Sequence, residues 1–77
     1  MSRGRWIVRG RVQGVGFRYA TQQRASALGL ACTVWNRDDG AVECTADGPD
    51  DRLAELERWL HQGPPLARVE TVERLAG

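Results

Sequence analysis

Residues that supply nucleophiles and metal ligands are scarce in this sequence of 77 residues. There is one histidine, His61, and the only serines are Ser2 and Ser26, so no Ser/His/Asp or Cys/His arrangement for covalent catalysis fits the spacing. Two cysteines, Cys32 and Cys44, are too few for a disulfide scaffold and are not spaced as a metal-binding knuckle. We therefore expect no metal and no cofactor, two cysteines acting as small core hydrophobes, and a reduced, cytoplasmic protein.

An excess of charge of one sign is also missing. Eleven basic and ten acidic residues nearly cancel, so no field over the whole chain attracts nucleic acid or a membrane surface. No apolar run is long enough to span a bilayer, and the arginine-rich N-terminus lacks the hydrophobic stretch of a signal peptide. The length predicts a single domain over 1–77, with a small core that requires a regular fold.

A glycine-rich stretch joins the first expected strand to the first expected helix. Alternation predicts a half-buried strand over residues 5–12, and apolar residues spaced by three and four predict a helix over residues 17–28. A glycine turn at this junction gathers backbone N–H groups at the positive end of the helix dipole, which favours an anion. We expect a phosphate there, with the guanidinium of Arg18 closing over it. The predicted phosphate-binding loop comprises Gln13, Gly14, Val15, Gly16, Phe17 and Arg18.

Residues 32–46 are typical of a β-hairpin. A three-residue turn at 38–40, with Gly40 in the left-handed conformation, sets a register in which Asn36 lies opposite Val42. This register gives one clean apolar face, which supports it. It also places Asn36 on the inner side of the sheet, at the end of its strand.

The remaining sequence predicts a second helix and a last strand. The helix follows Pro49, carries a stripe of leucines, and ends at Gly63 with His61 as a solvated residue of its last turn. The strand over residues 67–75 breaks strict alternation, which indicates a bulge or an edge position. The order βαββαβ predicts an α+β split βαβ sandwich, a four-stranded antiparallel sheet with two helices on one face.

An acyl phosphate is a substrate that this set of residues could hydrolyse. Its carboxylate leaving group departs without a general acid, and phosphoryl transfer then needs chiefly a held phosphate and a water in line. The loop amides and Arg18 would hold the anion, and would hold it more tightly as charge shifts in the transition state. The amide of Asn36 would orient the water. Because Asn36 is no base at neutral pH, the proton of the water would pass to the phosphate of the substrate.

Three motifs resemble those of the acylphosphatase family. They are Gly10-x-Val12-Gln13-Gly14-Val15-x-Phe17-Arg18, Ala25-x-x-Leu28-Gly29-Leu30 and Val34-x-Asn36-x-x-Asp39-Gly40-x-Val42-Glu43. The resemblance covers almost the whole chain and implies a ferredoxin-like sandwich that hydrolyses small-molecule acyl phosphates without a cofactor. It also implies that Arg18 binds the phosphate and that Asn36 positions the water, the same two residues that the chemistry indicates.

Two features depart from the family pattern. The strand before the hairpin turn reads Cys32-Thr33-Val34-Trp35-Asn36, where the family usually has Gly-Trp-Val-Arg-Asn, so the support of Asn36 is altered. The chain ends at Gly77 after the sixth element, whereas family members generally continue into a further C-terminal strand. We expect a monomer, and the open sheet edge predicts either lower stability or pairing of that edge with another chain.

Other interpretations fit parts of this pattern. The glycine loop is also compatible with a plain strand–helix turn, Arg18 with a surface charge and Asn36 with a cap of the hairpin turn. A non-catalytic relative would use the loop to bind a phosphorylated or carbamoylated group, as a regulatory or maturation module. An RNA-binding domain shares the βαββαβ order, but the third expected strand, 41–46, has no aromatic residue on which a base could stack.

Overall fold

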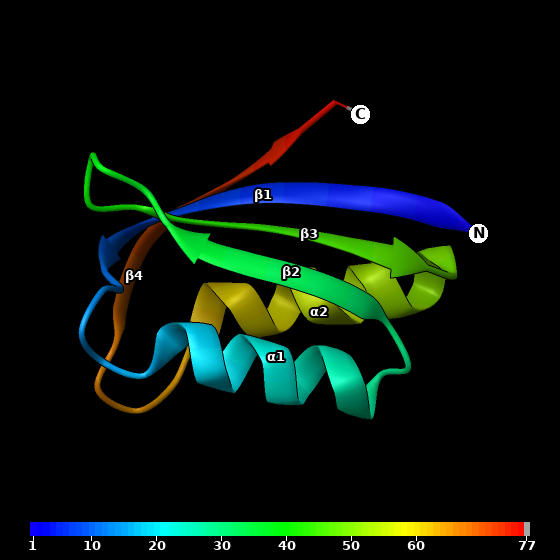
Figure 1. Cartoon of the computed structure of the whole chain (residues 1–77), viewed down its shortest axis with the longest axis horizontal. Helices are drawn as coiled ribbons and strands as arrows, with labels where there is room; N and C mark the ends of the chain where they lie inside the picture. The colour runs from blue at the N-terminus through cyan, green and yellow to red at the C-terminus, as the bar shows by residue number, and fades with distance from the viewer. Residues whose placement is uncertain (77) are drawn as a thin grey trace.

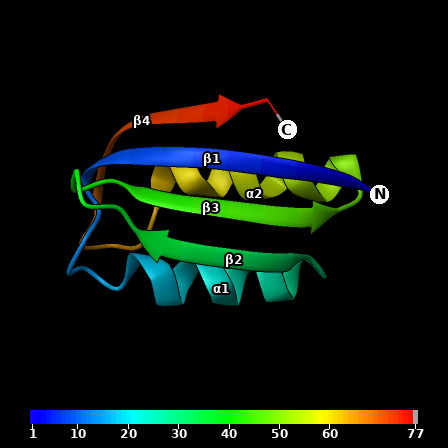
Figure 2. The ribbon, with the colours of Figure 1, turned by 45° about the horizontal axis from the view of Figure 1, so that its top comes forward.

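Six elements form a layer of β-sheet and a layer of helices (Figure 1). The computed structural model describes residues 1–76. The elements are β1 (Ser2–Arg11), α1 (Phe17–Ala27), β2 (Ala31–Asn36), β3 (Val42–Gly48), α2 (Asp50–Gln62) and β4 (Arg68–Leu75). Both helices cover the same face of the sheet, so the predicted α+β, ferredoxin-like sandwich is confirmed (Figures 1 and 2).

The sheet has the strand order β2-β3-β1-β4, and every neighbouring pair is antiparallel. The β2–β3 hairpin has the predicted register, with Asn36 opposite Val42. Strand β1 begins earlier than expected because Ser2 pairs with Gly48 at the far end of β3. Within residues 1–76 there are four strands, which leaves β2 and β4 at the edges (Figure 2).

Strand β4 shows both features that its broken alternation predicts. It lies at an edge, and its register against β1 shifts between Arg9 and Gly10, which leaves Glu70 as the extra residue of a bulge. Gly10 has φ +127°, and a side-chain Cβ there would meet the backbone oxygen of Arg68 and lie 2.8 Å from the backbone nitrogen of Glu70. This close approach of two backbones explains why a glycine stands at Gly10.

The core lies between the sheet and the helices. The predicted helix stripes are buried, and so is Cys44, while Cys32 is half-buried against the same cluster. The buried cluster comprises Trp6, Val8, Val12, Phe17, Ala25, Leu28, Leu30, Val42, Cys44, Ala46, Leu53, Leu56 and Leu60. Gly63 ends α2 with φ +69°, as predicted, and Gly29 follows the end of α1 with φ +72°.

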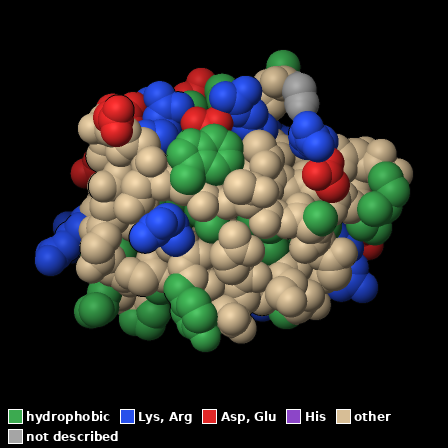
Figure 3. Space-filling view, in the orientation of Figure 1, with side chains coloured by type: hydrophobic (Ala, Val, Ile, Leu, Met, Phe, Trp, Pro, Cys, Tyr) green, Lys and Arg blue, Asp and Glu red, His purple; other side chains and the backbone are tan. Residues whose placement is uncertain are grey.

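Charged side chains of both signs gather along the sheet side of the molecule, at the top of the space-filling view (Figure 3). Ion pairs between residues of β1, β3 and the β2–β3 hairpin are Arg3–Asp47, Arg5–Glu43, Arg9–Asp39 and Arg37–Glu43. Within residues 1–76, no helix is long and apolar enough to cross a membrane.

Candidate active site

The connection from β1 to α1 is shaped by two glycines in the left-handed conformation. Gly14 has φ +74° and Gly16 has φ +77°. A Cβ at either position would meet no atom within 4 Å, so the backbone conformation and not the available space accounts for both glycines. The predicted glycine turn between strand and helix is therefore present.

The N-terminus of α1 leaves its backbone donors free. Gly16 is the N-cap and provides no side-chain hydrogen bond, and the first turn contains no acidic residue. Within residues 1–76, the N–H groups of residues 14–19 form no hydrogen bond of good geometry to a backbone carbonyl or a side chain. Helix α2 differs, since its first turn contains Asp50 and Asp51. Free N–H groups with the positive end of the helix dipole suit an anion.

Arg18 and Asn36 meet at this helix terminus. They line one hollow of about 170 Å³, although they come from α1 and from the end of β2. The side chain of Arg18 is exposed and forms no ion pair with any residue of the described chain. The complete lining is Val12, Gly14, Gly16, Phe17, Arg18, Tyr19 and Asn36.

Most of the predicted site residues line this hollow, but two do not. Gln13 and Val15 are outside the lining, and Val15 packs against the core. The side chain of Gln13 is directed at the hairpin instead, where its Nε2 donates to the backbone carbonyls of Arg37 at 2.8 Å and Ala41 at 3.0 Å. The predicted membership of Gln13 in the loop gave no sign of this contact.

Two residues of the lining were not predicted. Val12 is buried, and Tyr19 is 72% exposed at the side of the hollow. The signal for Tyr19 was its place directly after Arg18 in the first turn of α1, where neighbouring side chains surround the same helix terminus. Nothing in the local pattern distinguishes it from an ordinary exposed tyrosine.

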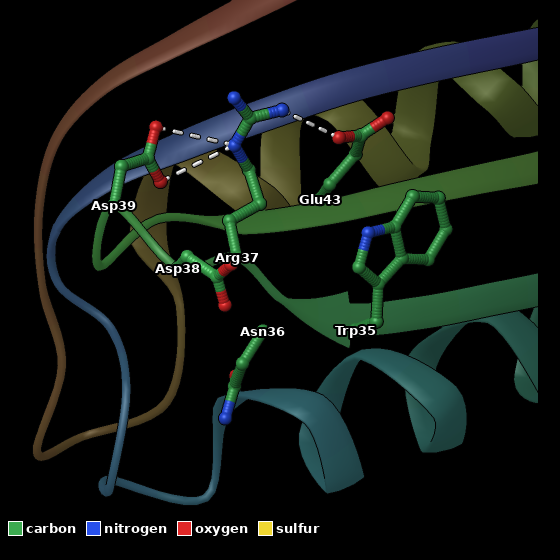
Figure 4. A pocket seen from close by; sticks show the side chains of 6 residues that line it. All are labelled: Trp35, Asn36, Arg37, Asp38, Asp39 and Glu43. Atoms are coloured by element: carbon green, nitrogen blue, oxygen red, sulfur yellow. Dashed lines mark hydrogen bonds and ion pairs between the residues drawn. The ribbon is translucent and has the colours of Figure 1, made fainter.

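Asn36 points toward the start of α1, whereas its neighbours point to the other face of the sheet (Figure 4). This follows from the alternation of side chains along β2. A second hollow, of about 430 Å³, lies beside it on that other face. Its lining is Trp35, Asn36, Arg37, Asp38, Asp39 and Glu43, and the close-up shows Arg37 reaching Asp39 and Glu43 (Figure 4).

Two carboxylates near the hairpin, Asp39 and Glu43, are held in the charged form. Hydrogen bonds from the Arg37 side chain, the Ala41 backbone and the Arg9 side chain hold the pKa of Asp39 well below its usual range. Burial raises the pKa of Glu43, but its hydrogen bonds to Arg5 and Arg37 outweigh this effect and lower it overall. Neither group has the raised pKa of a general acid or of a base tuned near neutral pH.

The single histidine lies apart from the hollow at the start of α1. His61 is exposed in the last turn of α2, as predicted. In the described part of the chain, no three His, Cys, Asp or Glu side chains gather in a way that could hold a metal ion.

The family model for acylphosphatase matches residues 4–75. An acylphosphatase of Halorhodospira halophila is 52% identical over 68 residues, which cover 88% of this chain and 74% of that protein. The chain belongs to the acylphosphatase family. The predicted family resemblance is therefore confirmed.

Solved structures agree with this assignment. The crystal structure of acylphosphatase from Bacillus subtilis superposes with a TM-score of 0.94 at 44% identity, covering 97% of this chain and 83% of that one. Full-length HypF in its phosphate- and nucleotide-bound form gives a TM-score of 0.81 at 25% identity. There the match covers 95% of this chain but only 10% of HypF.

Proposed function

We propose that this chain hydrolyses the carboxyl–phosphate bond of small acyl phosphates, giving a carboxylate and inorganic phosphate without a metal. Membership of the acylphosphatase family supports the enzyme class. The observation that carries the mechanism is the meeting of three elements around one hollow: free backbone donors at the start of α1, the side chain of Arg18 and the side chain of Asn36.

The phosphate binds first in this mechanism. Its oxygens accept hydrogen bonds from N–H groups of residues 14–18, and the guanidinium of Arg18 grips two oxygens at once. The helix dipole adds a favourable field at the same point. Because these groups are fixed before the reaction, they stabilise charge on the equatorial oxygens without reorganising.

Asn36 then orients a water opposite the acyl oxygen. The water oxygen forms a bond to phosphorus while the bond from phosphorus to the acyl oxygen breaks, and the electron pair of that bond leaves with the carboxylate. The proton of the water passes to a phosphate oxygen. Asn36 serves as a positioning amide, in keeping with a site where the nearby carboxylates Asp39 and Glu43 are engaged with arginines.

A non-catalytic phosphate-binding module is the alternative, and HypF shows that this fold also occurs within a much longer chain. Binding alone would require the loop and Arg18, whereas hydrolysis also requires the amide of Asn36. Relatives that are about half identical along most of this chain are acylphosphatases, so hydrolysis is the function we favour.

The test is hydrolysis of a simple aryl acyl phosphate by the purified chain, with and without a chelator. Replacing Arg18 with Gln should lower kcat/KM on the order of 10³-fold or more, by analogy with other transition-state arginines. Asn36→Ala should lower kcat by roughly 10²-fold, as when one positioned donor is lost, while inhibition by inorganic phosphate persists. Arg24→Gln, in the last turn of the same helix, is the matched control and should retain activity.

Two results would contradict the mechanism. Full activity of a folded Asn36→Ala protein would show that Asn36 does not orient the attacking water. Loss of activity in the presence of a chelator would show that the reaction requires a metal. A folded but inactive wild-type chain that still binds phosphate would favour the non-catalytic module.

Four expectations from the sequence stay predictions. They are a cytoplasmic location, a monomeric state, the effect of an open sheet edge and the absence of a nucleic-acid partner.

A further inference from the structure

The side chain of Gln13 joins the two segments that carry the proposed chemistry. It comes from the loop before α1, and its Nε2 donates to the carbonyls of Arg37 and Ala41 at 2.8 and 3.0 Å. Arg37 directly follows Asn36, and Ala41 directly precedes Val42, the residue opposite Asn36. One amide group therefore fastens both arms of the hairpin turn to the phosphate loop.

These bonds are not what closes the hairpin. The N–H of Arg37 donates to the carbonyl of Ala41 at 2.8 Å, and the N–H of Gly40 donates to the carbonyl of Arg37 at 3.2 Å. Both carbonyls thus keep a backbone partner when the Gln13 amide is removed, so no buried acceptor is left unpaired. What is lost is the connection between the hairpin and the loop.

We propose that Gln13 is a positioning residue that sets where Asn36 stands relative to the bound phosphate. This inference rests on the proposed function, since it acts through the water that Asn36 orients. In the proposed mechanism the phosphate is held by backbone groups and Arg18, whereas the hydrogen bonds of the Gln13 side chain go to the hairpin. Loosening the hairpin therefore changes the approach of the water while it leaves phosphate affinity in place.

Gln13→Met tests this with a side chain of similar length that has no donor. We expect kcat to fall roughly 10- to 100-fold, the scale of effect that a displacement of about 1 Å produces. The inhibition constant of inorganic phosphate should stay within about twofold of the wild type, because the loop donors are unchanged. Gln22→Met, the same substitution on an exposed position of α1, is the control and should leave kcat unchanged.

The decisive comparison repeats the substitution in the Asn36→Ala background. If Gln13 acts through Asn36, the second substitution should lower kcat by less than about twofold there, since the two residues act as a unit. Equal losses in both backgrounds would show that Gln13 acts independently of Asn36 and would overturn the inference. A weaker phosphate affinity that accounts for the whole loss would overturn it as well.

Gln13→Glu adds a readout that a purely structural role would not produce. At neutral pH its carboxylate would face two carbonyl oxygens, so activity should fall more than in Gln13→Met. As the pH approaches the usual carboxyl pKa of about 4.3, the protonated acid can donate one hydrogen bond, and activity relative to wild type should recover. If the activity of Gln13→Glu does not recover at low pH, the hydrogen bonds of the Gln13 side chain do not position Asn36. Unfolding of both Gln13→Met and Gln13→Glu would also contradict the inference, because the backbone bonds are expected to keep the hairpin closed.

The two hypotheses fail in different ways. If Arg18→Gln and Asn36→Ala lose activity while Gln13→Met does not, only the role of Gln13 is wrong. If Asn36→Ala is fully active, the proposed water-positioning step is wrong, and the role of Gln13, which acts through Asn36, is overturned with it.

Discussion

Glu43 is a buried carboxylate held by two arginines at the base of the β2–β3 hairpin. Its side chain is 4% exposed, with Oε2 at 2.7 Å from Nε of Arg5 and Oε1 at 2.7 Å from Nη1 of Arg37. The arginine side chains are 46% and 31% exposed, so they remain hydrated when the ion pair is broken. Glu43→Gln removes the charge and keeps the shape, which makes it the sharpest test of this arrangement.

The expected loss is that of one charge-assisted hydrogen bond. The Oε1 of a glutamine can still accept from one arginine, but its NH₂ group faces the donor of the other. A hydrogen bond to a charged group contributes about 1.5–3 kcal/mol, and hydration of the freed arginine favours the middle of that range, about 2 kcal/mol. For a domain of this size the melting temperature should fall by roughly 10 °C.

The loss should also depend on pH, with a sign fixed by the lowered pKa of Glu43. Burial raises this pKa, but the hydrogen bonds from Arg5 and Arg37 lower it by a larger amount, so the pKa in the folded protein lies below that in the unfolded chain. Such a carboxyl contributes stability above its unfolded pKa of about 4.3 and loses it as the pH falls through the folded value. The difference in the free energy of unfolding between wild type and Glu43→Gln should therefore be largest at neutral pH and should disappear in acid.

Urea denaturation followed by circular dichroism, at neutral pH and at about pH 3, measures this gap. Asp47→Asn is the control, because the Arg3–Asp47 pair has side chains 62% and 43% exposed and should contribute less than about 1 kcal/mol. The reasoning is refuted if Glu43→Gln costs no more than the control, or if its cost is the same in acid.

Two further substitutions test the packing of the sheet. Trp6 is fully buried, and its Nε1 donates to Oε1 of Glu57 at 2.8 Å. Trp6→Phe should therefore lower the free energy of unfolding, measured by urea denaturation, by about 1 kcal/mol or more. An unchanged free energy of unfolding would show that this hydrogen bond contributes nothing. Gly10→Ala places a Cβ against the backbone of Arg68, so we expect a loss of about 1–3 kcal/mol and faster amide exchange in β4. Wild-type exchange rates in β4 would mean that the bulge absorbs the methyl group.

Local patterns predict much of this fold because local geometry decides it. The turn at 38–40 fixes the hairpin register, so Asn36 could be placed opposite Val42 from the sequence. The broken alternation of the last strand indicated a bulge or an edge position, since an extra residue must disturb a period of two, and the structure shows where the bulge lies, at Glu70. The glycine turn before Arg18 was likewise readable, because a left-handed backbone at Gly14 and Gly16 favours glycine.

What the sequence did not predict depends on distant segments that meet only in the folded chain. The burial of Glu43 requires Arg5 from another strand, and nothing around Glu43 in the sequence distinguishes it from an exposed strand glutamate. Ile7 shares the face of the first strand that carries Arg5 and Arg9, yet it is only 7% exposed, opposite Glu43 and Glu73. Gln13 was assigned by its place in the loop, while its contacts lie across the site.

The two faces of the hairpin therefore have separable roles. Asn36 and the amide of Gln13 lie on the side of the phosphate loop, whereas Glu43 and Arg37 pair on the opposite face, next to the altered residue Trp35. If the backbone bonds close the turn, Glu43→Gln should lower stability but keep the wild-type kcat when it is assayed well below its melting temperature. Gln13→Met should instead lower kcat and leave stability unchanged. A loss of kcat in Glu43→Gln would instead mean that the outer ion pairs also fix Asn36, and that the altered strand affects catalysis directly.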